Sequence, residues 1–389
     1  MPSPNRFSAV LAGAALVLAA VFLPGCSRDR IGEEARRGLA HDPYPTAPEQ
    51  VAPEIRVLIF PETLLPSVRE GFEKRYGVKV VVDTFTTEAQ AHELVAGNPS
   101  KWDVVMLTQY MGNRLRGEGL LQPVPRLNPS IYQSIDRSMS DPQADPRMHY
   151  FVPFDYSALG ISFNVNYLGG FPKRWEYLSE HSRNSLLYGR ILMPDDMRYA
   201  LGVAMLYLGI DPERAGPADI AAARDLLIGN VENLGLRFAS DAEIGDEMTR
   251  GSALMAITWS GGAGAILRAR AECRFLIPEG RTIVTSDGLC IPRGSSKAPT
   301  AALFIEYMLH PYNSLLMANA CMYASSNTRS MRYADRFLVN GPSCMFPPPK
   351  ARIHLQPAEG ATLDLYREAW AQVKAATFDP SKIELLPVE

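Results

Sequence analysis

The sequence predicts an α/β protein built from two lobes, and three observations lead to this prediction. From about Glu54 onward, short β-rich runs alternate with segments of helical periodicity, which is typical of a mostly parallel sheet covered by helices on both faces. The body is long enough for two domains. A second set of strand and helix patterns begins near Pro153. Two such lobes facing each other predict a ligand cleft at the carboxyl ends of their strands.

The N-terminal region has the pattern of an export signal followed by a tether. The apolar run from Val10 to Leu23 is too short to span a bilayer comfortably and has the proportions of a signal-peptide core. The sequence LPGC, which ends at Cys26, resembles a bacterial lipoprotein cleavage site, so residues 1–25 are predicted to be a signal peptide and Cys26 a lipidated residue. An ordinary signal peptide or a core helix is the alternative. Residues 26–53 mix charges with prolines and are predicted to form a flexible tether, which places the body outside the cytoplasmic membrane.

The elements of the body follow from local patterns. A helix that begins at Pro66 is expected to end at Gly77, a C-terminal signal. Other helices are expected at 88–96, 110–117, twice within 197–235, after 260 and at 298–320, and strands at 55–60, 78–85, 103–107, 158–165, 190–193, 253–259, 275–277 and 283–291. The Gly261–Gly264 run follows a strand, so it is interpreted either as close helix packing or as an anion site at a helix start.

Composition and motifs exclude several classes of function. The net charge is −3 with both signs scattered, which argues against nucleic-acid binding. There is no CxxC, GxSxG, HExxH or P-loop, so no metal or cofactor is expected. The cysteines after Cys26 are expected mostly as buried apolar residues, and a disulfide between Cys273 and Cys290 is an open alternative.

Carboxylates and aromatic rings recur at the predicted strand ends. A dry cleft of this composition suits an organic cation, because ring faces attract it and carboxylates accept its N–H donors. Each residue also has a structural use, as a helix cap or a core ring. The candidates are Phe60, Glu62, Phe85, Tyr110, Asp155, Tyr156, Asp195, Asp196, Trp259 and Asp287.

From about Ile55 to Asn327 the chain resembles the polyamine-binding proteins of bacterial ABC importers, the spermidine/putrescine class. The resemblance rests on the order of several short stretches: Phe60-Pro61-Glu62, Trp102 to Val105, LRGEGLL at 115–121, PFDYSALGISFN at 153–164, Trp175 to Leu178, Asp195 to Arg198, Ile257 to Gly261, and SDGLCIP at 286–292.

The resemblance implies a type II periplasmic-binding-protein fold with discontinuous lobes and a ligand cleft between them. One lobe would take residues 54–152 and about 286–325, and the other 153–285 and about 326–389. Such a protein captures solute by lobe closure, delivers it to a membrane permease and does no chemistry on it. We expect a monomer.

By position, the resemblance assigns amine contacts to Glu62, Asp196 and Asp287. Tyr110 and Trp259 would be ring walls, and Thr108 would lie beside a hydroxyl contact. This sequence departs from the better-known members at three positions: Phe60 and Thr285 replace Trp, and Tyr199 replaces an acid. Loss of one carboxylate removes a charge-assisted hydrogen bond of roughly 1.5–3 kcal/mol.

Other functions stay open at this point. An amino acid ligand would need an arginine clamp, for which Arg198 is the candidate, and a sugar would use the same rings and acids. A ferric site would need clustered tyrosines. An extracellular hydrolase with paired carboxylates and a ligand sensor that has lost transport are the alternatives outside transport.

Overall fold

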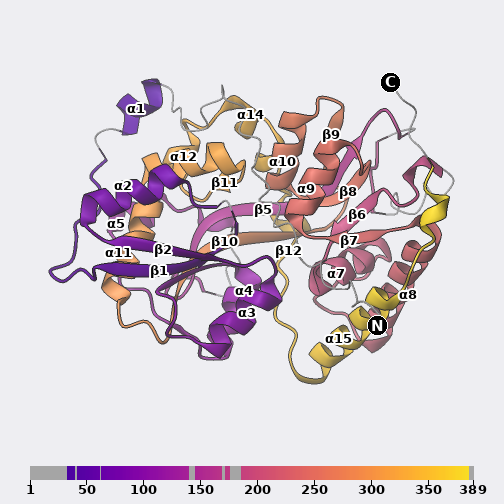
Figure 1. Cartoon of the computed structure of the whole chain (residues 1–389), viewed down its shortest axis with the longest axis horizontal. Coiled ribbons are helices and arrows are strands. Elements are labelled where there is room, and N and C mark those ends of the chain that lie inside the picture. The colour runs from indigo at the N-terminus through magenta and orange to yellow at the C-terminus, as the bar shows by residue number, and fades with distance from the viewer. Residues whose placement is uncertain are drawn as a thin grey trace, which may run out of the picture.

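The computed structural model describes residues 33–39, 42–61, 63–139, 145–168, 171–175 and 185–384. Two α/β lobes lie side by side, and long strands run between them (Figure 1). The predicted signal peptide and Cys26 lie outside the described residues.

The strands form one sheet that continues from lobe to lobe, in the order β2-β1-β3-β10-β5-β8-β6-β7. Neighbours are parallel within β2-β1-β3 and within β8-β6-β7, whereas β10 and β5 pair antiparallel with each other and with their outer neighbours. The bounds are β1 Glu54–Ile59, β2 Lys79–Thr84, β3 Val104–Thr108, β5 Val152–Asn164, β6 Ile191–Pro194, β7 Arg237–Ala239, β8 Met255–Trp259 and β10 Thr282–Pro292; shorter strands are β4 Leu121–Gln122, β9 Cys273–Leu276, β11 Ala324–Ser325 and β12 Arg352–Ile353.

In the first lobe, successive residues of the buried strands face different helix layers. Leu58 and Val105 pack in the core beneath α3 and α4, while Val57 and Val104 pack in the core beneath α2 and α11. This alternation follows from the period of two along a strand. The helices of this lobe are α1 Glu33–Leu39, α2 Pro66–Tyr76, α3 Glu88–Gly97, α4 Gln109–Gly117, α5 Pro129–Ser134, α11 Ala298–Met308, α12 Pro311–Cys321 and α13 Thr328–Met331.

The second lobe follows the same plan. Its helices are α7 Met197–Tyr207, α8 Pro217–Leu234, α9 Asp241–Arg250, α10 Ser260–Ala269 and α15 Gly360–Ala375, and α14 Arg336–Val339 lies in the segment that leads back to it. In Figure 1 the C-terminal helix α15 lies beside α8 and α7, far along the chain from both.

The prediction that 26–53 is a flexible tether is wrong for the part that the structure describes. Ala35 and Leu39 of α1 are buried in the core of the first lobe. Tyr44 stacks on His310, with ring centroids 3.9 Å apart, and the Arg75 guanidinium lies 3.9 Å from the Tyr44 ring centroid. The sequence pattern failed here because so few apolar side chains dock the segment.

Two element predictions also differ from the structure. The helix expected at 298–320 is two helices, because Pro311 lacks the N–H that would continue the first one. The strand expected from Ala158 begins at Val152, since it pairs with β10 along its earlier part. Just after β11, α13 packs on α12 of the first lobe, although the second lobe was expected to resume at about residue 326.

All four described cysteines are free thiols, so a Cys273–Cys290 disulfide is excluded in this structure. Cys273 pairs with Asn164 of β5, whereas Cys290 lies opposite Val105 of β3 in the other lobe. Among the described residues, no helix is long and apolar enough to span a membrane.

Candidate functional site

The site lies where β5 and β10 pass between the lobes. Asp287 of β10 is flanked by Asp155 of β5 on one side and by Thr108 of β3 on the other. The β5–β10 register shifts between Asp287 and Gly288, so the ladder is irregular beside both carboxyl groups. Such a bulge redirects side chains out of a regular sheet.

Asp155 and Asp287 form a coupled pair of acids. One oxygen of each, Asp155 Oδ1 and Asp287 Oδ1, is buried and has no hydrogen-bond partner among the described groups. Burial raises the pKa of Asp287 to about 7, and the charge of Asp241 raises it further. Burial and the Asp287 charge hold the pKa of Asp155 well above its usual range. Two like charges in a desolvated site favour a shared proton.

The second lobe contributes Asp196 at the start of α7. Its side chain caps the helix, because Oδ1 accepts the backbone N–H of Arg198 at 2.8 Å and of Tyr199 at 3.0 Å. Burial still raises the pKa of Asp196. Asp196 therefore serves both as the helix cap that its position predicts and as an acid of the cleft.

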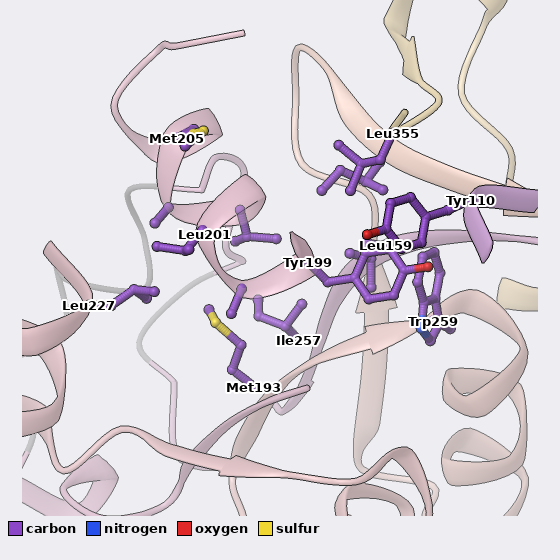
Figure 2. Packing of buried hydrophobic residues seen from close by; sticks show 14 of the residues in the cluster. Tyr110, Leu159, Met193, Tyr199, Leu201, Met205, Leu227, Ile257, Trp259 and Leu355 are labelled. Carbon is purple, nitrogen blue, oxygen red and sulfur yellow. The ribbon is translucent and has the colours of Figure 1, made fainter. Parts of the chain in front are cut away.

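Rings from both lobes close around these acids. Tyr110 comes from the start of α4, and Tyr199 meets Trp259 edge to face with centroids 4.9 Å apart. These three rings lie next to one another, with Leu159 and Leu355 close by (Figure 2). Tyr110, Tyr199 and Thr285 also line a narrow cavity together with Gln109, Asn113, Val284, His354 and Leu355.

Phe60 and Phe85 pair at the ends of β1 and β2, with ring centroids 4.4 Å apart. Phe85 is buried in the core, and Phe60 packs against the same core while remaining partly exposed. Glu62 lies outside the described residues. Thr108 caps α4 by accepting the Met111 N–H at 3.3 Å.

The structure does not bring Tyr156 together with the other candidates. Its ring packs edge to face on Phe346, with centroids 5.1 Å apart, and the groups whose charges act on it are Cys344, Asp136 and Arg352. The reason is the strand period: Asp155 faces Asp287, so its neighbour points to the opposite face.

Arg198 is not a free clamp for a ligand carboxylate. Its guanidinium donates to Glu213 Oε1 at 3.3 Å and to the Gln356 carbonyl at 3.0 Å, and it covers the Tyr366 ring at 4.4 Å from the centroid. Asp195 is exposed, and its carboxylate is also engaged, because it accepts a hydrogen bond from the Lys374 ammonium at 2.8 Å.

Two acids were missed by sequence reasoning. Glu88 is buried at the first position of α3; its Oε1 accepts the Thr108 N–H at 3.4 Å, and its Oε2 has no partner among the described groups. Burial, with the charges of Asp287 and Asp196, raises the pKa of Glu88 to about 8. Asp241, the exposed first residue of α9, adds a negative charge that raises the pKa of Asp287 and of Tyr323.

Both acids begin a helix shortly after a strand ends, so the rule that selected Asp196 applies to them as well. Sequence reasoning also missed Tyr323, whose pKa is held well above its usual range by burial and then by the charges of Asp241 and Asp287. A Cβ at Gly261 would lie 2.5 Å from the Tyr323 ring. The Gly261–Gly264 run therefore provides close packing for this ring.

The arrangement of acids can hold a cation. Burial raises the pKa of Glu88, Asp155, Asp196 and Asp287. Negative charges add to this: Asp287 and Asp196 act on Glu88, Asp287 acts on Asp155, and Asp241 acts on Asp287. Arg198 is the only basic group among the causes that act on these acids. Within the described part of the chain, no cluster of histidine, cysteine and acidic residues could bind a metal ion.

Comparison with known proteins agrees with this fold. The family model for bacterial extracellular solute-binding proteins matches residues 68–335. The spermidine/putrescine-binding periplasmic protein of Salmonella typhimurium is 25% identical over 321 residues, which cover 81% of this chain and 89% of that one. The putrescine/agmatine-binding protein of Pseudomonas aeruginosa is 22% identical over 332 residues, covering 81% and 90%.

A solved structure, a putative spermidine/putrescine ABC transporter protein from Listeria monocytogenes, has a TM-score of 0.75 at 23% identity and covers 83% of this chain and 99% of its own. This likeness confirms the type II periplasmic-binding-protein fold predicted from the sequence. The chain therefore belongs to the bacterial extracellular solute-binding protein family, whose members are non-enzymatic, periplasmic or extracellular solute-binding components of ABC transporters.

Proposed function

We propose that the cleft binds a small linear organic cation with two or more amino groups, of the putrescine and spermidine type. One observation carries this proposal: Glu88 Oε2, Asp155 Oδ1 and Asp287 Oδ1 are buried carboxyl oxygens without a described partner. A buried acceptor without a partner costs about 1–3 kcal/mol, and more when it is charged. Ammonium groups supply both the missing donors and the missing positive charge.

The rings fit the rest of such a ligand. Tyr110, Tyr199 and Trp259 present apolar faces and edges to the methylene chain, and ring faces attract the ammonium ends by about 0.5–2 kcal/mol each. A neutral sugar would stack on the same rings but would leave the mutual repulsion of the acids uncompensated. An amino acid would lack its carboxylate partner, because Arg198 is engaged by Glu213.

Delivery to an ABC permease and a lipid anchor at Cys26 belong to the same proposal. Family membership supports the first, and the LPGC sequence supports the second. Cys26→Ser is expected to move the protein from the membrane to the soluble fraction and to remove the mass of the lipid. A variant that stays membrane-bound with unchanged mass would contradict the anchor.

A thermal-shift screen tests the ligand. Putrescine, spermidine, cadaverine, lysine, arginine, thiamine and glucose would be added to the purified protein. At a hundredfold excess over its dissociation constant, a specific ligand adds about 2.7 kcal/mol of stability. We expect a rise in Tm with a polyamine, and Asp287→Asn should weaken that binding more than tenfold.

Asp195→Asn is the matched control, because Asp195 is an exposed acid on the neighbouring turn and pairs with Lys374. The rise in Tm that a polyamine causes should be the same in Asp195→Asn as in the unmodified protein. A flat polyamine response together with a rise for lysine or glucose would overturn the proposed ligand while leaving the family assignment intact.

A further inference from the structure

The acids Asp155 and Asp287 are placed to act as one unit. They lie directly opposite each other on β5 and β10, the two strands that run between the lobes. Each has one buried oxygen that has no hydrogen-bond partner among the described groups, and the charge of Asp287 acts on Asp155. Two neighbouring carboxyl groups that are removed from water favour a state in which one proton is shared between them.

Among the described residues, the groups whose charges act on the pair or that lie beside it include no protein cation. From the first lobe, Thr108 of β3 lies opposite Asp287, and Glu88 of α3 adds a further acid. From the second lobe come Asp196 and Tyr199 of α7 and Asp241 of α9. On the remaining side, Ser325 of β11 pairs with Asp155, and Tyr323 precedes that strand. All of these groups are acidic or neutral, so none of them can neutralise a second negative charge on the pair.

We propose that Asp155 and Asp287 together hold one ammonium group of the ligand, and that this ammonium displaces the proton which the two carboxyl groups share. The inference rests on the proposed organic cation as ligand. In the exchange, the O–H bond of the shared proton breaks and the proton goes to solvent, while the ammonium keeps its own three protons. The pair carries one negative charge with its proton; with the ammonium in place it carries two negative charges against one positive charge. The local net charge is therefore unchanged, and the desolvated site gains no uncompensated charge.

The exchange has a consequence for affinity. Because a proton competes with the ammonium, putrescine should bind more tightly as pH rises towards the range in which the pair loses its proton unaided. Each proton released per ligand corresponds to a tenfold change in Kd per pH unit. Glu88 can contribute a second released proton at the same pH, since burial raises its pKa to about 8.

Isothermal titration calorimetry of the full chain with putrescine tests the inference at pH 7. Titrations in phosphate, HEPES and Tris separate proton release from binding, because the observed heat varies with the ionisation enthalpy of the buffer. We expect the unmodified protein to release one to two protons per putrescine. The Asp155→Asn variant should release about one proton fewer per putrescine, because a lone Asp287 has no second carboxyl group with which to share a proton. The change in Kd per pH unit should be about tenfold smaller in this variant than in the unmodified protein. Asp195→Asn should match the unmodified protein.

The outcomes separate this inference from the proposed function. Putrescine binding with no proton release, or with release that Asp155→Asn leaves unchanged, would overturn the shared proton and keep the ligand class. Absence of binding by putrescine, spermidine and cadaverine would overturn both. Asp287→Asn is the second variant should Asp155→Asn fail to fold, and it should also lower the release by about one proton.

Discussion

Replacing Glu88 with glutamine should stabilise the ligand-free protein and weaken its binding. Burial raises the pKa of this carboxyl from 4.5 to about 8. A group whose pKa is raised on folding contributes stability that is complete below its unfolded value and is lost as pH rises through its folded value. Each pKa unit corresponds to about 1.36 kcal/mol, and the carboxyl group is half ionised at about pH 8. The shift therefore lowers the free energy of unfolding by about 4 kcal/mol at pH 8 and by about 1 kcal/mol at pH 5.

Glutamine keeps the size of the side chain and an oxygen that accepts the Thr108 N–H, but it carries no charge. We therefore expect the free energy of unfolding of Glu88→Gln to exceed that of the unmodified protein by about 2–4 kcal/mol at pH 8 and by far less at pH 5. Urea unfolding at pH 5, 6.5 and 8 without ligand measures this difference. Putrescine affinity should fall in the same variant, because one acceptor of the cleft is lost.

Glu93→Gln is the matched control, since Glu93 lies exposed on the same helix. It should change neither the stability nor its pH dependence. The reasoning would be refuted if Glu88→Gln were no more stable than the unmodified protein at pH 8, or if the difference did not grow with pH.

Two further predictions concern the aromatic residues. Trp259→Ala should weaken polyamine binding by up to about thirtyfold, and by more than Phe60→Ala, because Trp259 meets Tyr199 beside the acids whereas Phe60 packs mainly on Phe85. Calorimetry measures the Kd of both variants. A larger loss of affinity in Phe60→Ala would place the main ring wall on the first lobe. Tyr44→Ala should lower the free energy of unfolding by about 1–3 kcal/mol without changing ligand affinity, because it removes the ring that docks the N-terminal segment. An unchanged Tm would mean that this docking does not stabilise the protein.

Much of the fold could be predicted because the inner strands β3, β5, β6 and β8 are buried on both faces and several helices end at clear signals. Gly77 takes a left-handed conformation with φ 68° and ends α2 where the sequence predicts. The pairing of β5 with β10 could not be predicted from local pattern, since the two strands are far apart in the sequence and cross between lobes. The early start of β5 follows from that pairing.

The candidate site follows from the sequence only in part. Asp196 follows β6 and Trp259 ends β8, as their strand-end positions predict, whereas Asp287 lies inside β10, opposite Asp155 of β5. Glu88 was missed because it also begins an ordinary amphipathic helix, and its burial depends on the opposite lobe. Tyr156 was included wrongly among the site residues that converge, since one step along β5 reverses the direction of the side chain. Such errors arise where long-range packing decides which face meets the cleft.

A crystal structure of the protein with putrescine tests the central claim most directly. The account predicts one ligand nitrogen within hydrogen-bond distance of both Asp155 Oδ1 and Asp287 Oδ1, with the methylene chain between the rings of Tyr110 and Trp259. Putrescine bound outside this cleft, or an ordered complex in which neither carboxyl oxygen contacts a ligand nitrogen, would contradict it.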